Sequence, residues 1–312
     1  VDTDVKNRLR SGALKRRLDT LSEGTVILTI RDPDITTIGD TNLAVERVRF
    51  EAPFFECKTL LRVDLKGCTK LTSVGNAAFA GCSSLTSIVL PDSLTQVGKS
   101  AFQECTTLTS LVFPDSLTEL GDSAFEGCTA LTSVVLPDSL TQLGVAAFRK
   151  CTSLTSVVLP DSLTQVGKEA FNECTSLTSL VFPDSLTQLG EQAFQKCTSL
   201  TSVVLPDSLT ELGKQAFAGC SSLISMVLPD RAELGDEVFY ECDALEQKAA
   251  LAGFASVEFY LRDRYKSITL RKLVLRLLRK YNKAVNNADG TEAEKHSSAL
   301  AQFPADNSGS LE

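Results

Sequence analysis

The cysteines of this chain recur at a fixed spacing, which limits the possible folds more than any other feature of the sequence. Seven of them are 23 residues apart and an eighth follows after 22, and each has a phenylalanine three residues before it. These cysteines are Cys82, Cys105, Cys128, Cys151, Cys174, Cys197, Cys220 and Cys242. A repeat of roughly 20–29 residues built on leucines is typical of a solenoid in which every repeat forms one coil.

The unit at 131–153 shows why the chain coils. Leu131, Val134 and Leu136 have the spacing of a short strand whose inward side chains meet a core. Pro137 then turns the chain, because its ring fixes the backbone dihedral angle φ and the aspartate that follows accepts hydrogen bonds from nearby amides. Each repeat therefore begins with a strand that ends in a tight turn.

The second half of the same unit predicts a short helix. Ala147, Phe148 and Cys151 have i, i+1, i+4 spacing, which places them on one face of a helical turn. Gly144 precedes them, and we expect it to adopt a conformation that other residues reach only with strain. Stacking such units predicts a parallel sheet on one side, helices on the other, and files of Leu, Phe and Cys in the core.

These residues resemble the BspA-like leucine-rich repeat family, whose pattern is approximately L-x-x-I-x-I-P-x-x-(V/L)-x-x-I-G-x-x-A-F-x-x-C-x-x-L. The resemblance runs from about Leu60 to Cys242. It implies an α/β repeat solenoid, a right-handed leucine-rich-repeat coil with a parallel β-sheet on one face and short helices on the other. Members of the family are usually described as surface-exposed binding or adhesion proteins, and no enzymatic activity accompanies the repeat itself.

Departures from the repeat predict helical extensions at both ends of the chain. Residues 1–24 carry an apolar stripe at helical spacing and predict an N-terminal helix or cap, and residues 25–59 predict a degenerate first repeat. The solenoid itself is predicted over 60–242. Residues 243–285 predict a C-terminal cap and a basic amphipathic helix, and the polar residues 286–312 predict a flexible tail.

The basic helix has an unusual charge. Between Arg262 and Lys283 there are nine basic residues and one acidic residue, so this segment carries +8 in a chain whose net charge is −8. The candidate partner-binding residues on it are Arg271, Lys272, Arg276, Arg279 and Lys280. Two roles are possible for this helix. In the first, which we favour, it docks onto an acidic partner; in the second, it folds back onto the solenoid.

A second candidate surface lies on the strands. Residues that alternate with the buried ones should point away from the core, and in each repeat one of them is a valine. The candidate partner-binding valines are Val112, Val135, Val158, Val181 and Val204, in a file that also includes Val89 and Val227. We expect these valines to form one exposed apolar column, and such a column usually marks a contact surface.

The repeats differ mainly between the glycine and the Ala-Phe pair, for example at Asp122, Val145 and Lys168. A surface that recognises one irregular ligand should vary along its length. Recent duplication of the repeat is one explanation of the uniform sheet face. The alternative explanation is that partner specificity lies at the ends of the solenoid and on this variable side.

Composition excludes several classes of function. An excess of acidic residues, 39 against 31 basic, is unsuited to nucleic-acid binding, so no nucleic-acid partner is expected. The single histidine, His296, lies in the polar tail, and we predict no catalytic residue, no metal site and no cofactor. No apolar run is long enough to span a bilayer, so no transmembrane segment is expected.

Together these features predict a non-catalytic protein–protein interaction scaffold and no enzyme. One setting is a peripheral subunit of a larger assembly with protein partners. The alternative is a surface adhesin that binds an extracellular protein or matrix. The cysteines are expected to be buried thiols, which favours an intracellular or organellar location, with the cell surface as the alternative.

Overall fold

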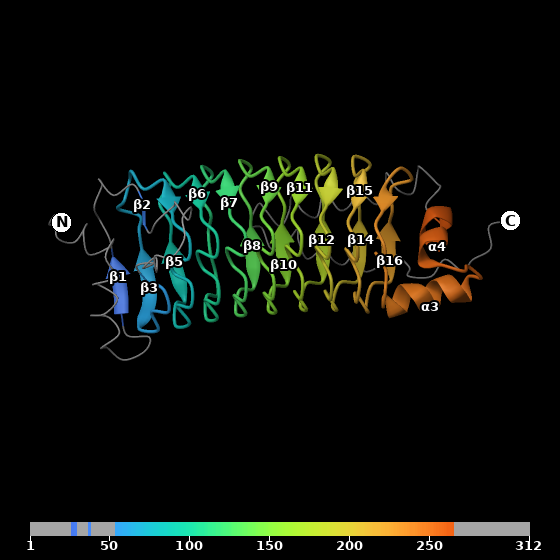
Figure 1. Ribbon diagram of the computed structural model, residues 1–312, viewed down its shortest axis with the longest axis horizontal. Coiled ribbons are helices and arrows are strands. Elements are labelled where there is room, and N and C mark those ends of the chain that lie inside the picture. The colour runs from blue at the N-terminus through green and yellow to red at the C-terminus, as the bar shows by residue number, and fades with distance from the viewer. Residues whose placement is uncertain (1–25, 30–36, 39–53, 265–312) are drawn as a thin grey trace, which may run out of the picture.

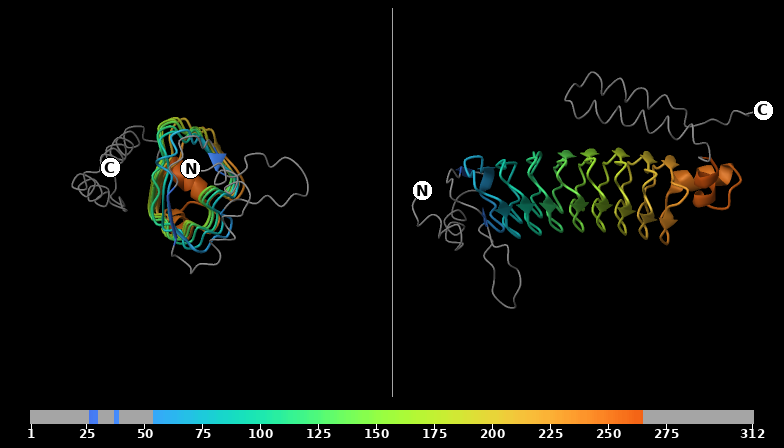
Figure 2. Two further views of the ribbon diagram at one scale, coloured as in Figure 1. Left: turned by 90° about the vertical axis from the view of Figure 1, so that its left-hand side faces the viewer. Right: turned by 90° about the horizontal axis from the view of Figure 1, so that it is seen from above.

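The computed structural model describes residues 26–29, 37–38 and 54–264. Over these residues the chain is a solenoid of parallel strands, stacked coil on coil along one axis (Figure 1). Two faces of the solenoid carry strands and a third consists of turns. The coils end at two helices, which lie beyond the last strands (Figures 1 and 2).

The first face carries the strands that begin each repeat. They are β1 (Val26–Thr29), β3 (Leu60–Asp64), β5 (Ser87–Val89), β8 (Ser133–Val135), β10 (Ser156–Val158), β12 (Ser179–Val181), β14 (Ser202–Val204) and β16 (Ser225–Val227). Hydrogen bonding groups them as β1-β3-β5, β8-β10 and β12-β14-β16. On this face, the coil that contains Val112 has no strand and only an isolated bridge, between Ser87 and Ser110.

The second face consists of two-residue strands. They are β2 (Thr37–Ile38), β4 (Ser73–Val74), β6 (Gln96–Val97), β7 (Glu119–Leu120), β9 (Gln142–Leu143), β11 (Gln165–Val166), β13 (Gln188–Leu189), β15 (Glu211–Leu212) and β17 (Glu233–Leu234). They pair in the orders β2-β4-β6-β7 and β9-β11-β13-β15-β17.

Equivalent residues of neighbouring coils pair with one another on both faces. Ser156 pairs with Ser133 and Val158 with Val135, and all pairings between named strands are parallel. A strand alternates its side chains between the two sides of a sheet, so each repeat position forms a file of like residues, either inside or outside.

The third side has turns where short helices were expected. In the segment that contains Phe148, Ala146 has φ of 54° and Lys150 has φ of 59°, and a right-handed helix does not tolerate such left-handed residues. The amides of Ala146, Phe148 and Lys150 instead donate to carbonyls of the next coil, each at 2.8 Å. The backbone is therefore paired between coils on this side as well, and the prediction of helices here is wrong.

Phenylalanine rings form the centre of the core. Phe54, Phe79, Phe102, Phe125, Phe148, Phe171, Phe194 and Phe217 are fully buried, and consecutive rings lie 5.0–5.5 Å apart between centroids, within 11° of parallel. At this separation nearly parallel rings are offset, which is a favoured aromatic geometry. The file of rings therefore packs each coil against the next.

The glycine file serves a different purpose from the one expected. Gly144 does not have positive φ, but a Cβ atom built on it would lie 2.8 Å from the backbone of Gly121 in the preceding coil. Such a contact is too short for any side chain, so glycine is needed here for the close approach of two backbones and not for an unusual conformation.

The two helices follow the last coil. Helix α3 spans Asp243–Leu251 and buries Leu245, and helix α4 spans Val257–Arg264 and buries Leu261. The Arg262 guanidinium of α4 donates to the carbonyls of Asp230 at 2.8 Å and Ala232 at 3.1 Å, which fixes α4 to the last coil.

The predicted N-terminal helix (1–24), the basic amphipathic segment from 265 to 285 and the tail (286–312) lie outside the described residues.

Removing one ring from the file should destabilise the solenoid strongly. Phe148→Ala leaves a cavity between Phe125 and Phe171, each 5.5 Å away, and rigid neighbouring coils cannot close it. The expected loss is about 3–5 kcal/mol in the free energy of unfolding, measured by urea denaturation. Val145→Ala, at an exposed side chain in the same coil, should cost less than about 0.5 kcal/mol. Equal effects of the two substitutions would contradict this packing.

Candidate protein-interaction surface

The valines predicted as a contact surface all belong to the first face. We name Val89, Val112, Val135, Val158, Val181, Val204 and Val227 the valine strip; all but Val112 are the last residues of their strands. The residue before each of them is buried in the core, so alternation directs the valines outward. At the N-terminal end the strip stops at Asp64, which pairs with Val89 in the ladder.

Exposure of the valine strip changes along the solenoid. Val89 is 46% exposed, Val112 81% and Val135 57%, whereas Val158 is 8%, Val204 6% and Val227 2% exposed. Val181 is partly buried. The expectation of one continuous exposed column is therefore wrong for Val158, Val204 and Val227, which are buried. The exposed part, which we name the open patch, consists of Val89, Val112 and Val135.

The open patch lies between two rows of polar residues. On one side are serines and threonines, and the threonine hydroxyls donate to the backbone carbonyl of the equivalent threonine one coil earlier, at 3.0–3.5 Å. On the other side one aspartate per coil is exposed in the turn after each proline, including Asp92, Asp115 and Asp138. The patch is thus an apolar strip with an acidic margin.

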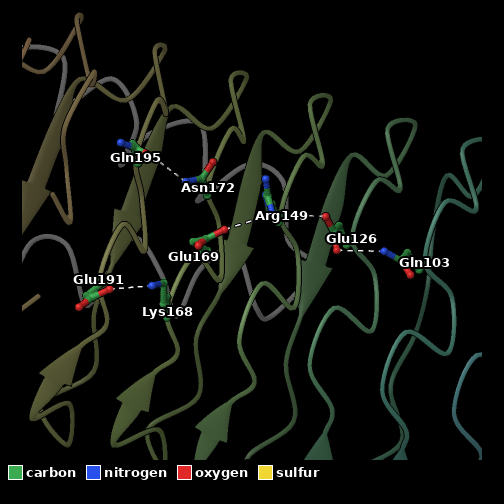
Figure 3. Close-up of polar contacts among 8 residues, drawn as sticks. All are labelled: Gln103, Glu126, Arg149, Lys168, Glu169, Asn172, Glu191 and Gln195. Carbon is green, nitrogen blue, oxygen red and sulfur yellow. Dashed lines mark hydrogen bonds and ion pairs between the residues drawn. The ribbon is translucent and has the colours of Figure 1, made fainter. Parts of the chain in front are cut away.

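The turn side carries a polar ladder that the sequence analysis missed (Figure 3). Arg149 lies between two carboxylates, 3.7 Å from Glu126 and 3.2 Å from Glu169, and Gln103 donates to Glu126 at 3.1 Å. One coil further, buried Asn172 donates to Gln195 at 2.9 Å. Because Gln103, Glu126, Arg149, Asn172 and Gln195 are 23 residues apart in the sequence, reading this file of the repeat would have found them.

A separate ion pair lies beside this ladder. The Lys168 ammonium donates to Glu191 at 2.7 Å, and this hydrogen bond raises the pKa of Lys168 and lowers the pKa of Glu191. Both groups are exposed, so the pair contributes little to stability. It marks a side of the solenoid where side chains differ from coil to coil.

The cysteines are buried thiols. All ten described cysteines are free, and each thiol from Cys105 to Cys242 donates to a phenylalanine carbonyl of the preceding coil at 3.1–3.3 Å. Burial raises the pKa of Cys128 well above its ordinary value, and the neighbouring thiol of Cys151 raises it further. A thiol that stays protonated is a poor nucleophile and a poor metal ligand.

The described part of the chain contains neither a metal-binding cluster nor a helix that could cross a membrane. No group of three or more His, Cys, Asp or Glu side chains within residues 26–29, 37–38 and 54–264 is arranged to hold a metal ion. Among the same residues no helix has the length and apolar character needed to cross a membrane. The predicted binding residues Arg271, Lys272, Arg276, Arg279 and Lys280 lie outside the described residues.

The stacked coils, the buried leucine files and the strand-bearing faces define a leucine-rich repeat solenoid. A family model described as the BspA type leucine rich repeat region matches residues 50–178 and 141–261, with six copies. The chain belongs to the BspA-type leucine-rich repeat family, and the resemblance inferred from its sequence is confirmed. Proteins of this family generally act in protein interaction or at surfaces.

The chain is also similar to solved structures of leucine-rich repeat proteins. A leucine-rich repeat protein from Bacteroides ovatus ATCC 8483 is 29% identical, with a TM-score of 0.53, over 70% of this chain and 62% of that one. This chain thus spans less than two thirds of the Bacteroides protein. A leucine rich cell surface protein from Faecalibacterium prausnitzii A2-165 is 24% identical, with a TM-score of 0.44, over 71% of this chain and 74% of that one. No protein with a curated description matches the chain by sequence.

The buried thiols predict a loss of stability at alkaline pH. Burial raises the pKa of the folded thiols from Cys105 to Cys242, to about 12 for Cys242, whereas an unfolded thiol ionises near pH 8.5. Because the folded pKa is the higher one, the stabilisation is complete below about pH 8.5 and falls as the pH rises toward the folded value. Each of these thiols contributes a slope of about 1.4 kcal/mol per pH unit in this range. Urea unfolding between pH 7.5 and about 10 measures the slope.

Cys151→Ala is the matched variant for this measurement, because it removes one thiol from the file and leaves the other titrating groups in place. The variant should be less stable than wild type at neutral pH. As the pH rises, its free energy of unfolding should fall less steeply than that of wild type, by about 1.4 kcal/mol per pH unit, the slope of one thiol. An identical slope in the two proteins would show that Cys151 does not resist ionisation in the folded state.

Proposed function

We propose that this protein is a non-catalytic scaffold that binds a protein partner through the open patch. The observation that carries the proposal is the exposure of Val89, Val112 and Val135 in three successive coils of one regular face. A contiguous apolar strip with polar rows on both sides is typical of a protein contact site.

The surroundings of the open patch favour association. The threonine hydroxyls beside it already donate to the backbone, so covering them leaves few donors without a partner. Covering the side chain of Val112, which is 81% exposed, is worth about 1–2 kcal/mol of hydrophobic free energy. The partner surface that fits is an apolar ridge with basic residues on the side of Asp92, Asp115 and Asp138.

The arrangement of polar groups supports a role without catalysis. Leucine-rich repeat solenoids are typically non-enzymatic, and an enzyme needs several different groups to converge on one reacting atom. Here the side chains of one kind are spread along the solenoid at equal intervals. The net charge of −8 likewise supports a protein partner over a nucleic acid.

Two settings suit such a scaffold. In the first it is a peripheral subunit of a larger assembly in a reducing compartment, which ten free thiols favour. In the second it is a surface adhesin, as the surface roles found in its family favour. The number of thiols in protein purified from its native source separates the two settings: ten reduced thiols support the first, and oxidised ones support the second.

Introducing a charge into the open patch should weaken partner binding. Val112→Asp places a carboxylate where the partner is apolar, and burying it without a counter-ion should weaken binding by about tenfold or more. The measurement is quantitative mass spectrometry of proteins retained from the native source on immobilised wild-type and variant chains.

Val145→Asp is the control, because Val145 is an exposed valine on the turn side of the solenoid. Proteins that are retained by wild type and by Val145→Asp but lost with Val112→Asp are the expected partners. The proposal fails if Val112→Asp retains the same proteins in the same amounts as wild type.

A further inference from the structure

The open patch is long and narrow. Across the strands it is one valine wide, because Ser110 on one side of Val112 and Asp115 on the other side are exposed polar residues. Along the solenoid axis it continues over three coils, and it ends at Asp64 in one direction and at the buried Val158 in the other. A partner that covers this apolar surface is therefore a rod that lies along the axis, with an apolar stripe one residue wide.

The spacing of the coils selects the kind of rod. The three coils of the open patch contain Phe102, Phe125 and Phe148, whose stacked rings are 5.1 and 5.5 Å apart between centroids. An α-helix advances about 5.4 Å per turn, so one side chain per turn stays opposite the valines over all three coils. In an extended strand, side chains on one side recur at about 6.6 Å and lose this match. The spacing therefore favours a helix whose apolar residues recur at i, i+4 and i+7.

The two margins of the open patch differ in charge. Asp92, Asp115 and Asp138 are exposed along one margin, one in each coil. On the other margin the Thr109 and Thr132 hydroxyls donate to backbone carbonyls of the preceding coil at 3.4 and 3.5 Å, which leaves their oxygens as neutral acceptors. A helix with one lysine or arginine per turn on a single flank matches this arrangement, because its charged donors then face the aspartates.

We infer that the partner of the open patch presents an amphipathic helix, which lies along the solenoid axis with a basic flank toward Asp92, Asp115 and Asp138. The helix is about three turns long, or about 11 residues, since a further turn would reach the charged Asp64 at one end or Val158, which is 8% exposed, at the other. The inference rests on the proposed function, and it adds the secondary structure, the direction and the charge of the partner.

Three synthetic peptides test the inference. The first is alanine-rich and about 15 residues long, with leucine at i, i+4 and i+7 and one lysine per turn on one flank. The second has glutamate in place of each lysine, and the third has the composition of the first except for a central proline that breaks the helix. Fluorescence anisotropy of each labelled peptide, titrated with the full chain, gives its Kd. The first peptide should bind more tightly than either of the others by about tenfold or more.

Variants of the open patch locate the bound peptide. Val112→Ser removes apolar surface without adding charge and should weaken the lysine peptide by about fivefold or more. Val145→Ser is the matched control, because Val145 is an exposed valine on the turn side, and it should leave the Kd within about twofold.

A second set of variants tests the acidic margin. The triple variant Asp92→Asn, Asp115→Asn and Asp138→Asn should weaken the lysine peptide by about tenfold. The control triple variant Glu119→Gln, Glu211→Gln and Glu233→Gln removes the same charge from exposed positions of the second face. It should leave the Kd within about twofold, because these carboxylates do not border the open patch.

Four outcomes would overturn the inference. The lysine peptide does not bind wild type, or it binds Val112→Ser as tightly as wild type. The glutamate peptide binds as tightly as the lysine peptide, which would remove the basic flank, or the proline peptide does so, which would remove the helix. The proposed function fails in a different experiment, when Val112→Asp and wild type retain the same native proteins. If that variant loses its native partners while the peptides give any of the four outcomes, the open patch still binds a partner and only the helix is wrong.

Discussion

Backbone hydrogen bonding between neighbouring coils is the constraint on which the rest of this structure depends. Both strand faces and the turn side pair each coil with the next, so every coil must follow the same path. A fixed path brings each residue close to its equivalent one coil away. Files of like residues follow from this, with stacked rings in the core and glycines where backbones touch.

The one shortened repeat shows how strict this constraint is. The spacing of 22 before Cys242 arises because one residue is missing from the turn after Pro229, compared with the turn after Pro206. The strand that follows is still in register, since Glu233 pairs with Glu211 and Leu234 with Leu212. A turn absorbs the change in length because its end points are fixed by the pairing on either side.

The sequence predicted the features that repeat, and it missed the path of the backbone on the turn side and the differences in exposure between coils. Leucine spacing gave the strands, and the family resemblance follows from the same residues. Spacing of i, i+1, i+4 at Ala147, Phe148 and Cys151 suits one helical turn, but it equally suits two successive tight turns. Only the pairing of alternate amides with the next coil decides between them. Alternation along the strands likewise directs Val158 outward, yet Val158 is buried, whereas Val135 in an identical stretch of the preceding coil is 57% exposed.

Regular repetition creates a problem for recognition, because identical coils offer a partner the same contacts at every step of about 4.8 Å. A specific complex needs a feature that fixes the position of the partner along the axis. The open patch has such limits. Asp64 takes the place of a valine at one end, with Arg62 beside it in the serine file, and the buried Val158 begins at the other.

Those limits leave room for three valines, and a partner shifted by one coil would place the charged Asp64 in its apolar contact or lose an exposed valine at Val158. Specificity on this solenoid therefore comes from where the repetition stops. The uniform coils supply the apolar contact, and the interruptions at Asp64 and Val158 determine where along the solenoid the partner binds.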